Sequence, residues 1–260
     1  MNEIQAFVLG LVQGLTEFLP VSSSGHLEIG NHIFHQKGEE NLTFTIALHT
    51  ATVLSTLVVF RKEIRMLMAN GLTFKKNAES GYILKLFLSS VPVAIVGLFF
   101  REEVESLFTG NLLLVGSCLV LTATLLSFAH FSNRERTRDI GWKHSLIIGT
   151  AQALAVLPGI SRSGSTIATG ILLGNKKEET ARFSFLMVII PILGAAFLDL
   201  SHKSSDVMQV NPLPLAIGFL TAFFTGWLAC SWMINIVKKG KLIYFAVYCL
   251  AIGLIAIFAA

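Results

Sequence analysis

The sequence predicts an all-α polytopic membrane protein whose two halves form an inverted-topology repeat. Three observations support this fold class. Hydrophobic residues make up 53% of the 260 residues and charged residues only 14%, with a mean hydropathy of +0.68, whereas soluble domains carry about 25% charged residues. Most basic residues gather in four short segments, and the phrase "QGLTEFLPVSSSGH" (13–26) is echoed by "AQALAVLPGISRSGS" (151–165). Each half is expected to hold one re-entrant helical hairpin and three transmembrane helices.

Six apolar-dominated stretches are long enough, or nearly so, to cross the hydrocarbon core of a bilayer, which takes about 20 helical residues. The expected spans are residues 42–60, 82–100, 111–131, 183–200, 213–237 and 242–260. The start of the chain lacks the basic residues and cleavage site of a signal peptide, so the first apolar run is expected to stay in the mature protein. The three cysteines lie inside apolar runs, which argues against a disulfide framework or a metal site.

Two further apolar stretches, residues 4–34 and 146–174, are each interrupted by a proline and a cluster of serine and glycine. Proline ends a helix and serine caps a new one, so each stretch is predicted to be two short helices joined by a break. Two broken helices of this kind are expected to meet near the middle of the membrane.

The placement of lysine and arginine predicts the orientation. Fifteen of the twenty lie in residues 61–76, 134–143, 176–182 and 238–241, which we treat as cytoplasmic loops. Since the second and third of these loops lie on the same side, the segment between them must enter and leave the membrane from that side. The net charge of +4 reflects these loops and is no sign of nucleic-acid binding.

A shift of 139 residues superimposes the two halves. It aligns Gly10 with Gly149, Gln13 with Gln152, Ser22 with Ser161, Ser24 with Ser163, Gly25 with Gly164 and Phe44 with Phe183. Each half then has an odd number of full spans, so residues 140–260 are inserted upside down relative to residues 1–139, within a single membrane domain. The first hairpin therefore enters from the outside. The alternative is chance similarity between two segments rich in apolar and small residues.

Gln13 and Glu17 are four residues apart and share one helix face. A carboxylate within a membrane segment is costly and marks a candidate functional site. Glu17 is expected to bind a hard divalent cation or to act as a base, and Gln13 can offer its amide oxygen to the same ligand. The alternative is an interfacial carboxylate that pairs with backbone donors.

The serine clusters Ser22-Ser23-Ser24-Gly25 and Ser161-Arg162-Ser163-Gly164 precede resumed helices. Unpaired N–H groups at two facing helix starts form an anion site, although capping alone is the simpler interpretation. The Arg162 guanidinium can bind a phosphate with two parallel hydrogen bonds, and pairing with Glu17 is its structural alternative.

Two histidines lie near this group in the sequence. His26 follows the first serine cluster and is a candidate acid, base or nucleophile, or else a structural residue. His49, inside "ALHTATV", is interpreted as a packing residue or one that supports the site indirectly. Together these groups fit phosphoryl chemistry on a phosphate held within the membrane. A secondary transporter or a flippase of a phosphorylated lipid is the rival, because inverted repeats with broken helices are also a transporter architecture.

At these residues the sequence resembles the undecaprenyl-diphosphate phosphatase family, also called the bacitracin-resistance protein family. The resemblance rests on three motifs: Gln13-Gly14-Leu15-Thr16-Glu17, which fits (E/Q)xxxE, Ser22 to His26, and Pro158 to Thr166, which fits PGxSRSxxT. The later stretch "ARFSFLMVIIPILGA" (181–195) is also similar, and the likeness covers essentially the whole chain.

The resemblance implies a multi-pass hydrolase of the bacterial inner membrane that cleaves undecaprenyl diphosphate to the monophosphate and phosphate, recycles the cell-wall carrier lipid and confers bacitracin resistance. It implies a periplasm-facing active site of Glu17, Ser23, His26, Arg162 and Thr166. The pocket would be lined by Gln13, Ser22, Ser24, Gly25, Ser161, Ser163 and Gly164. The implied cofactor is Mg²⁺ or Ca²⁺ on Glu17. The first position of the (E/Q)xxxE motif is Gln13 here and not a glutamate, which removes one anionic ligand of the cation. The diphosphate is therefore expected to supply most of the cation's ligands. A homodimer is compatible with this family, and the nucleophile stays open between Ser23 and His26.

Overall fold

The computed structural model describes residues 1–260 except 36–38, 72–76, 109, 133–136 and 203–210, and for residues 39–42 and 196–202 it describes the backbone alone. Within this part of the chain all regular secondary structure is helical, and one isolated bridge joins Arg138 to Asn175. The predicted all-α class is therefore confirmed. Some of the basic residues used to predict orientation lie outside the described residues, namely Lys37, Lys75, Lys76, Arg134, Arg136 and Lys203.

The helices of the described residues are α1 (Glu3–Phe18), α2 (Ser23–Ile33), α3 (Glu39–Val59), α4 (Arg61–Gly71), α5 (Ala78–Phe99), α6 (Arg101–Glu105), α7 (Leu112–Phe131), α8 (Trp142–Leu154), α9 (Arg162–Leu172), α10 (Lys177–Met187), α11 (Ile189–His202), α12 (Pro212–Lys238) and α13 (Leu242–Phe258).

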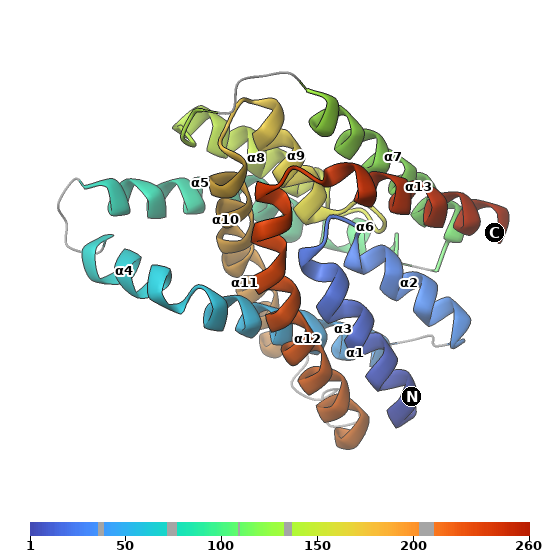
Figure 1. Cartoon of the computed structure of the whole chain (residues 1–260). Coiled ribbons are helices and arrows are strands. Elements are labelled where there is room, and N and C mark those ends of the chain that lie inside the picture. The colour runs from blue at the N-terminus through green and yellow to red at the C-terminus, as the bar shows by residue number, and fades with distance from the viewer. Residues whose placement is uncertain (36–38, 72–76, 109, 133–136, 203–210) are drawn as a thin grey trace.

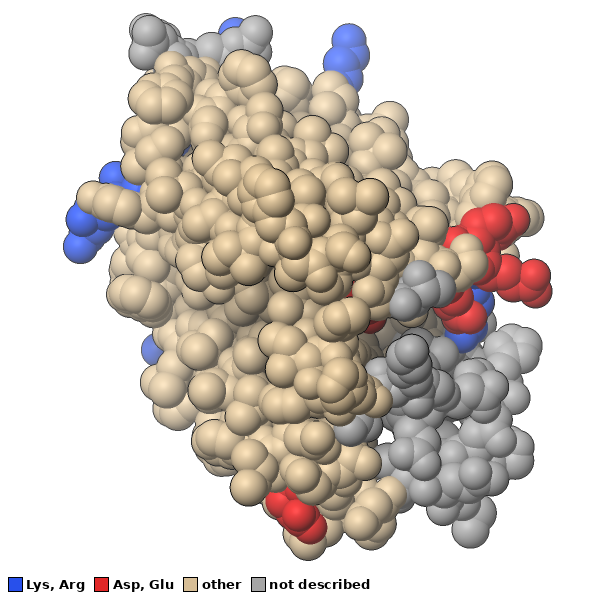
Figure 2. Space-filling model, turned by 90° about the vertical axis from the view of Figure 1, so that its right-hand side faces the viewer, with Lys and Arg blue, Asp and Glu red and all other residues tan. Residues whose placement is uncertain are grey.

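Several of these helices are long and apolar enough to cross a membrane. Among the described residues, α5, α7 and α12 meet both conditions with 22, 20 and 27 residues, and α13 is a shorter apolar helix. At 1.5 Å per residue, α5 is about 33 Å long, which matches a hydrocarbon core of about 30 Å. Figure 2 shows a broad uncharged face with charged side chains at its margins. The chain is therefore a multi-pass membrane protein.

The predicted loop 61–76 is largely a helix, which corrects the sequence-based expectation. α4 follows α3 at Phe60, and the two axes are bent by 74°. Leu67 is buried and Ile64 packs against the core, whereas Arg65 is exposed. Since Ile64 and Leu67 are three residues apart, they share a helix face, and their burial stabilises a helix where charge counting indicated only a loop.

The predicted single span 183–200 is also corrected. α10 begins at Lys177, within the predicted loop 176–182, and a break at Val188 separates it from α11. Pro191 explains the break because it has no backbone N–H to donate to the Met187 carbonyl four residues earlier. That carbonyl instead lies 3.5 Å from the Ser90 hydroxyl, which donates to it.

The two broken stretches form helical hairpins, as the sequence predicted. α1 and α2 form the first and α8 and α9 form the second (Figure 1). α1 packs along α12, α8 packs on α5, and α13 runs beside α7. Each hairpin is thus held by a long helix from the other half of the chain. The largest core cluster surrounds the second hairpin and includes Leu119, Ile148, Ile167 and Phe185.

Candidate active site

The two hairpins are capped in the same way at their resumed helices. The Ser22 hydroxyl accepts a hydrogen bond from the Gly25 N–H at 3.2 Å, and the Ser161 hydroxyl accepts one from the Gly164 N–H at 3.0 Å. Ser22 has a φ of 68°, a left-handed conformation that costs energy for a residue with a side chain. The caps leave other N–H groups of each first turn available to a ligand.

Each hairpin has a tip, formed by the residues between its two helices (19–22 and 155–161) and the first turn of the second helix, and the two tips meet. The Ser163 hydroxyl donates to the Leu19 carbonyl at 3.0 Å, which joins α9 to the break in the first hairpin. A Cβ atom added to Gly25 would lie 2.9 Å from the Cα of Gly159. Glycine is therefore required at residue 25 for the tips to approach this closely.

α7 and α13 each bind one tip. The Thr122 hydroxyl on α7 donates to the Gly159 carbonyl at 3.2 Å and accepts from the Ser161 N–H at 3.0 Å. The Cys249 thiol on α13 lies 3.5 Å from the Pro20 carbonyl. Pro20 and Gly159 are 139 residues apart, the offset that aligns the two halves, so equivalent carbonyls are bound by helices from opposite halves.

Glu17 is the centre of the cluster formed at these tips. Its Oε1 atom forms an ion pair with Arg162 Nη2, and its Oε2 atom accepts hydrogen bonds from the Ser23 hydroxyl at 2.6 Å and from Gln13 Nε2 at 3.0 Å. Its side chain is only 6% exposed. The structure thus brings together four residues that the sequence singled out.

The Glu17–Arg162 pair is both charged and largely buried. Removing either charge from such a pair leaves the other uncompensated in an environment of low dielectric constant. Charge-assisted hydrogen bonds stabilise the carboxylate, and an ionised carboxylate accepts without donating. Glu17 can therefore receive the proton of the Ser23 hydroxyl, which already points at it.

The other end of Arg162 identifies a residue that the sequence analysis missed. Arg162 Nη1 donates to the Ser184 carbonyl at 3.2 Å, and the Ser184 and Thr166 hydroxyls are 2.6 Å apart. Thr166 also donates to the Arg162 carbonyl at 2.9 Å. Ser184 lies within the stretch 181–195 that carries part of the resemblance, which was the available signal. Thr166 therefore supports Arg162 through the backbone carbonyl of that residue, and within the described structure it is not one of the residues bound to Glu17.

His49 contacts the Glu17 cluster directly, which differs from the packing role expected from the sequence. Its Nδ1 atom lies 3.0 Å from Gln13 Nε2 and 3.4 Å from Glu17 Oε2. An amide nitrogen only donates, so Nδ1 accepts from Gln13 and the ring proton belongs on Nε2. The signal in the sequence was a polar residue in the middle of a span, which by default indicates function.

His26 lies apart from this cluster. In the part of the chain that the structure describes, its ring hydrogen-bonds the Ser22 carbonyl and the Tyr248 hydroxyl, not Glu17 or Ser23. Among the remaining serines, the Ser24 hydroxyl is 3.3 Å from that of Ser22 in the first cap. The Ser163 hydroxyl is 3.3 Å from that of Ser161 in the second cap and also donates to Leu19 of the first hairpin.

The described residues contain no group of three or more His, Cys, Asp and Glu side chains that could hold a metal ion. The donors at Glu17 nevertheless fit a hard cation in part. Gln13 is fully buried, and its Oε1 atom has no hydrogen-bond partner within the described structure. An unpaired amide oxygen beside a carboxylate provides two oxygen ligands of the kind that Mg²⁺ and Ca²⁺ prefer.

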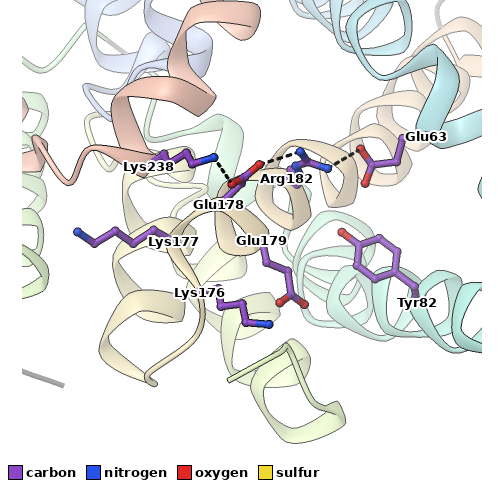
Figure 3. A pocket seen from close by; sticks show the side chains of 8 residues that line it. All are labelled: Glu63, Tyr82, Lys176, Lys177, Glu178, Glu179, Arg182 and Lys238. Carbon is purple, nitrogen blue, oxygen red and sulfur yellow. Dashed lines mark hydrogen bonds and ion pairs between the residues drawn. The ribbon is translucent and has the colours of Figure 1, made fainter. Parts of the chain in front are cut away.

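A cavity of about 840 Å³ lies away from these residues and between α4, α5, α10 and α12 (Figure 3). Its lining consists of Glu63, Tyr82, Lys176, Lys177, Glu178, Glu179, Arg182 and Lys238.

Four of the charged side chains that line this cavity form one ion-pair network. Glu178 accepts from Lys238 at 2.9 Å and from Arg182 at 2.8 Å, and Arg182 lies 3.9 Å from Glu63. The hydrogen bond from Lys238 lowers the pKa of Glu178, whereas burial raises the pKa of Glu63. The network joins α4 to α10 and α12, and none of its four members is a hydroxyl hydrogen-bonded to a base, so the candidate active site is the Glu17 cluster.

Comparison with known proteins identifies the family of the chain. The family model described as "Bacitracin resistance protein BacA" matches residues 6–255. A protein of Parabacteroides distasonis named undecaprenyl-diphosphatase is 55% identical over 260 residues, which cover 99% of this chain and 98% of the relative. Proteins of the same name from Bacteroides fragilis and Oceanobacillus iheyensis are 54% and 37% identical, over 99% and 98% of this chain and 98% and 95% of their own lengths. The chain belongs to the bacitracin resistance protein BacA family.

Proposed function

We propose that this protein is a membrane-embedded phosphatase that hydrolyses undecaprenyl diphosphate to undecaprenyl phosphate and inorganic phosphate, and so recycles the carrier lipid of peptidoglycan synthesis. The observation that carries the proposal is the Ser23 hydroxyl, which donates at 2.6 Å to a buried carboxylate that is itself paired with an arginine. A nucleophile bound to a base that is oriented by a third group is the arrangement required for covalent catalysis.

The reaction follows from these contacts. Ser23 Oγ attacks the terminal phosphorus while its proton passes to Glu17 Oε2, and the bond from that phosphorus to the bridging oxygen breaks, which releases undecaprenyl phosphate. Water then attacks the phosphorus of the phosphoserine and the bond from phosphorus to Ser23 Oγ breaks. Glu17 returns the proton to Oγ, and inorganic phosphate leaves with the oxygen and protons of the water. Arg162 and the N–H groups at the start of α9 bind the phosphoryl oxygens, whose charge is largest in the transition state.

His26 is assigned a supporting acid–base role in the second step. The hydrogen bond from Ser23 to Glu17 favours Ser23 as the nucleophile, and His26 has its own partners. A divalent cation, Mg²⁺ or Ca²⁺, would be held by Glu17 and Gln13 Oε1 together with the substrate phosphates, and it would offset the negative charge of the diphosphate.

The proposal extends to the topology. The two halves, residues 1–139 and 140–260, are taken as inverted repeats in the bacterial inner membrane, with the site open toward the periplasm. Two observations support the repeat: the matched caps at Ser22 and Ser161, and the binding of Pro20 and Gly159 by helices of opposite halves. The polyprenyl tail would lie between helices in the lipid. A homodimer stays compatible with this arrangement, and the net charge gives no reason to expect nucleic acid.

Release of phosphate by the purified protein in detergent tests the proposal, because detergent removes the compartments that transport needs. We expect phosphate release from undecaprenyl diphosphate and a loss of at least 100-fold in Ser23→Ala. Ser117→Ala is the matched control, since Ser117 is an exposed serine whose hydroxyl donates to the Leu113 carbonyl of its own helix. Ser23→Ala at the wild-type rate would refute the serine nucleophile, and an inactive wild-type protein would favour the transporter.

A further inference from the structure

His26 is fixed at the start of α2 by a contact with its own helix. Its Nδ1 atom lies 2.8 Å from the Ser22 carbonyl, and its backbone N–H donates to the same oxygen at 3.2 Å. A carbonyl oxygen only accepts, so Nδ1 carries the ring proton. Nε2 is then the basic nitrogen of the neutral ring.

The second partner of the ring comes from the opposite end of the chain. The Tyr248 hydroxyl is 2.9 Å from His26 Nε2, although the two residues are 222 positions apart. Since Nε2 has no proton in this tautomer, the tyrosine hydroxyl donates and Nε2 accepts. The two rings are also parallel, with 6° between their planes and 5.6 Å between their centroids.

Tyr248 is held firmly enough to orient another side chain. It lies on α13, which packs along α7, and the next residue, Cys249, contacts the Pro20 carbonyl at the tip of the first hairpin. α13 therefore contacts this hairpin at two successive residues. Tyr248 is itself 42% exposed, so its side chain is not enclosed in the core.

We propose that Tyr248 is a positioning residue for His26, and this inference rests on the proposed phosphatase function. The Ser22 carbonyl sets the tautomer, the tyrosine hydroxyl holds the unprotonated Nε2 toward an oxygen site, and the stacked ring fixes the plane of the imidazole. When a water molecule replaces the tyrosine hydroxyl at Nε2, the histidine accepts its proton without turning. The arrangement selects the tautomer before the substrate arrives.

The decisive variant is Tyr248→Phe, which keeps the stacked ring and removes only the hydroxyl. We expect kcat for phosphate release to fall about three- to tenfold, the range for one lost hydrogen bond, with KM unchanged within twofold. Tyr244→Phe is the matched control, because Tyr244 lies one turn earlier on the same helix and is 66% exposed. We expect it to keep the wild-type kcat and KM.

Two further measurements separate positioning from a general structural role. In ¹⁵N-histidine NMR of the detergent-solubilised protein, Tyr248→Phe should shift the Nε2 signal of His26, identified by its loss in His26→Gln, while Tyr244→Phe leaves it in place. In the His26→Gln background, Tyr248→Phe should cause no further loss of kcat.

The possible outcomes are distinct. The positioning role would be overturned if Tyr248→Phe left the Nε2 signal unshifted or kept the wild-type kcat. It would also be overturned if Tyr248→Phe lowered kcat by the same factor in the His26→Gln background as in the wild-type protein. A wild-type protein that releases no phosphate would instead overturn the proposed function, while the NMR signal would still report whether Tyr248 hydrogen-bonds His26.

Discussion

Glu17 and Arg162 are 145 residues apart in the sequence and form a buried ion pair where the two hairpin tips meet. The pair gives the carboxylate a fixed charged partner, so Ser23 and Gln13 can both donate to its other oxygen. Neither hairpin contains the site alone. The first hairpin supplies the proposed nucleophile and base. The second supplies the Arg162 guanidinium, which binds the base and, in the proposed reaction, the phosphoryl oxygens.

Glu17→Gln removes the charge and keeps the shape of the side chain. Arg162 is then left buried without its anion, so we expect the free energy of unfolding in detergent to fall by about 3 kcal/mol and phosphate release to fall at least 100-fold. Glu105→Gln is the control, because it breaks the exposed Arg101–Glu105 pair, whose loss costs less than about 1 kcal/mol. Equal stability losses in the two variants would contradict the buried pair.

Gly25→Ala tests the close approach of the tips. The added Cβ would lie 2.9 Å from the Cα of Gly159, and a backbone atom cannot move aside as a flexible side chain would. We expect the tips to separate and phosphate release to fall more than tenfold, since small misplacements of catalytic groups have large effects on rate.

Gly97→Ala is the matched control for this substitution. Gly97 is also helical, but nothing lies within 4 Å of its added Cβ. Alanine is the better helix former, so the control should keep its activity and gain up to about 1 kcal/mol of stability. Wild-type activity in Gly25→Ala, measured beside this control, would show that the tips are not in tight contact.

The sequence predicted the hairpins and most of the central cluster because both depend on local patterns. A proline followed by serines ends one helix and caps the next, and a carboxylate or an arginine within an apolar segment is conspicuous in any membrane protein. Ser184 and His49 could not be placed in this way. Each reaches the site only because α10 and α3 pack beside the hairpins, and helix packing leaves no short motif. The helix after the bend at Phe60 likewise depends on packing, because Ile64 and Leu67 face the core. The break at Val188, in contrast, follows from Pro191, a signal that the sequence did carry.

His49→Ala tests the residue that the structure added to the site. Its Nδ1 atom accepts from Gln13 Nε2, so its loss leaves the amide with one acceptor, Glu17. We expect kcat to fall about fivefold, the effect of one hydrogen bond of about 1 kcal/mol, without a loss of folding. His32→Ala, at an exposed position near the end of α2, should keep the wild-type rate. If both variants keep it, His49 is a packing residue after all.

Gln13→Glu tests the proposed cation site. A second carboxylate beside Glu17 adds an anionic ligand, so we expect the concentration of Mg²⁺ or Ca²⁺ that half-restores activity after EDTA treatment to fall about tenfold, and to rise in Gln13→Ala. Gln5→Glu is the control, because Gln5 lies in the capping box of α1, where glutamate is equally suitable. An unchanged half-restoring concentration in both Gln13 variants would exclude this residue as a ligand.

The proposed orientation is tested by labelling single cysteines with a membrane-impermeant maleimide. The three native cysteines are free and buried, so they give little background labelling. Lys62 on α4 and Glu102 on α6 are both exposed, at segments predicted to lie on opposite sides of the membrane. Because basic segments stay in the cytoplasm, Glu102→Cys should be labelled in intact cells and Lys62→Cys only after permeabilisation.

Both variants should release phosphate normally, since neither residue is near Glu17 in the proposed arrangement. Labelling of Lys62→Cys in intact cells would reverse the orientation and would place the first hairpin, with its reacting groups, on the cytoplasmic side.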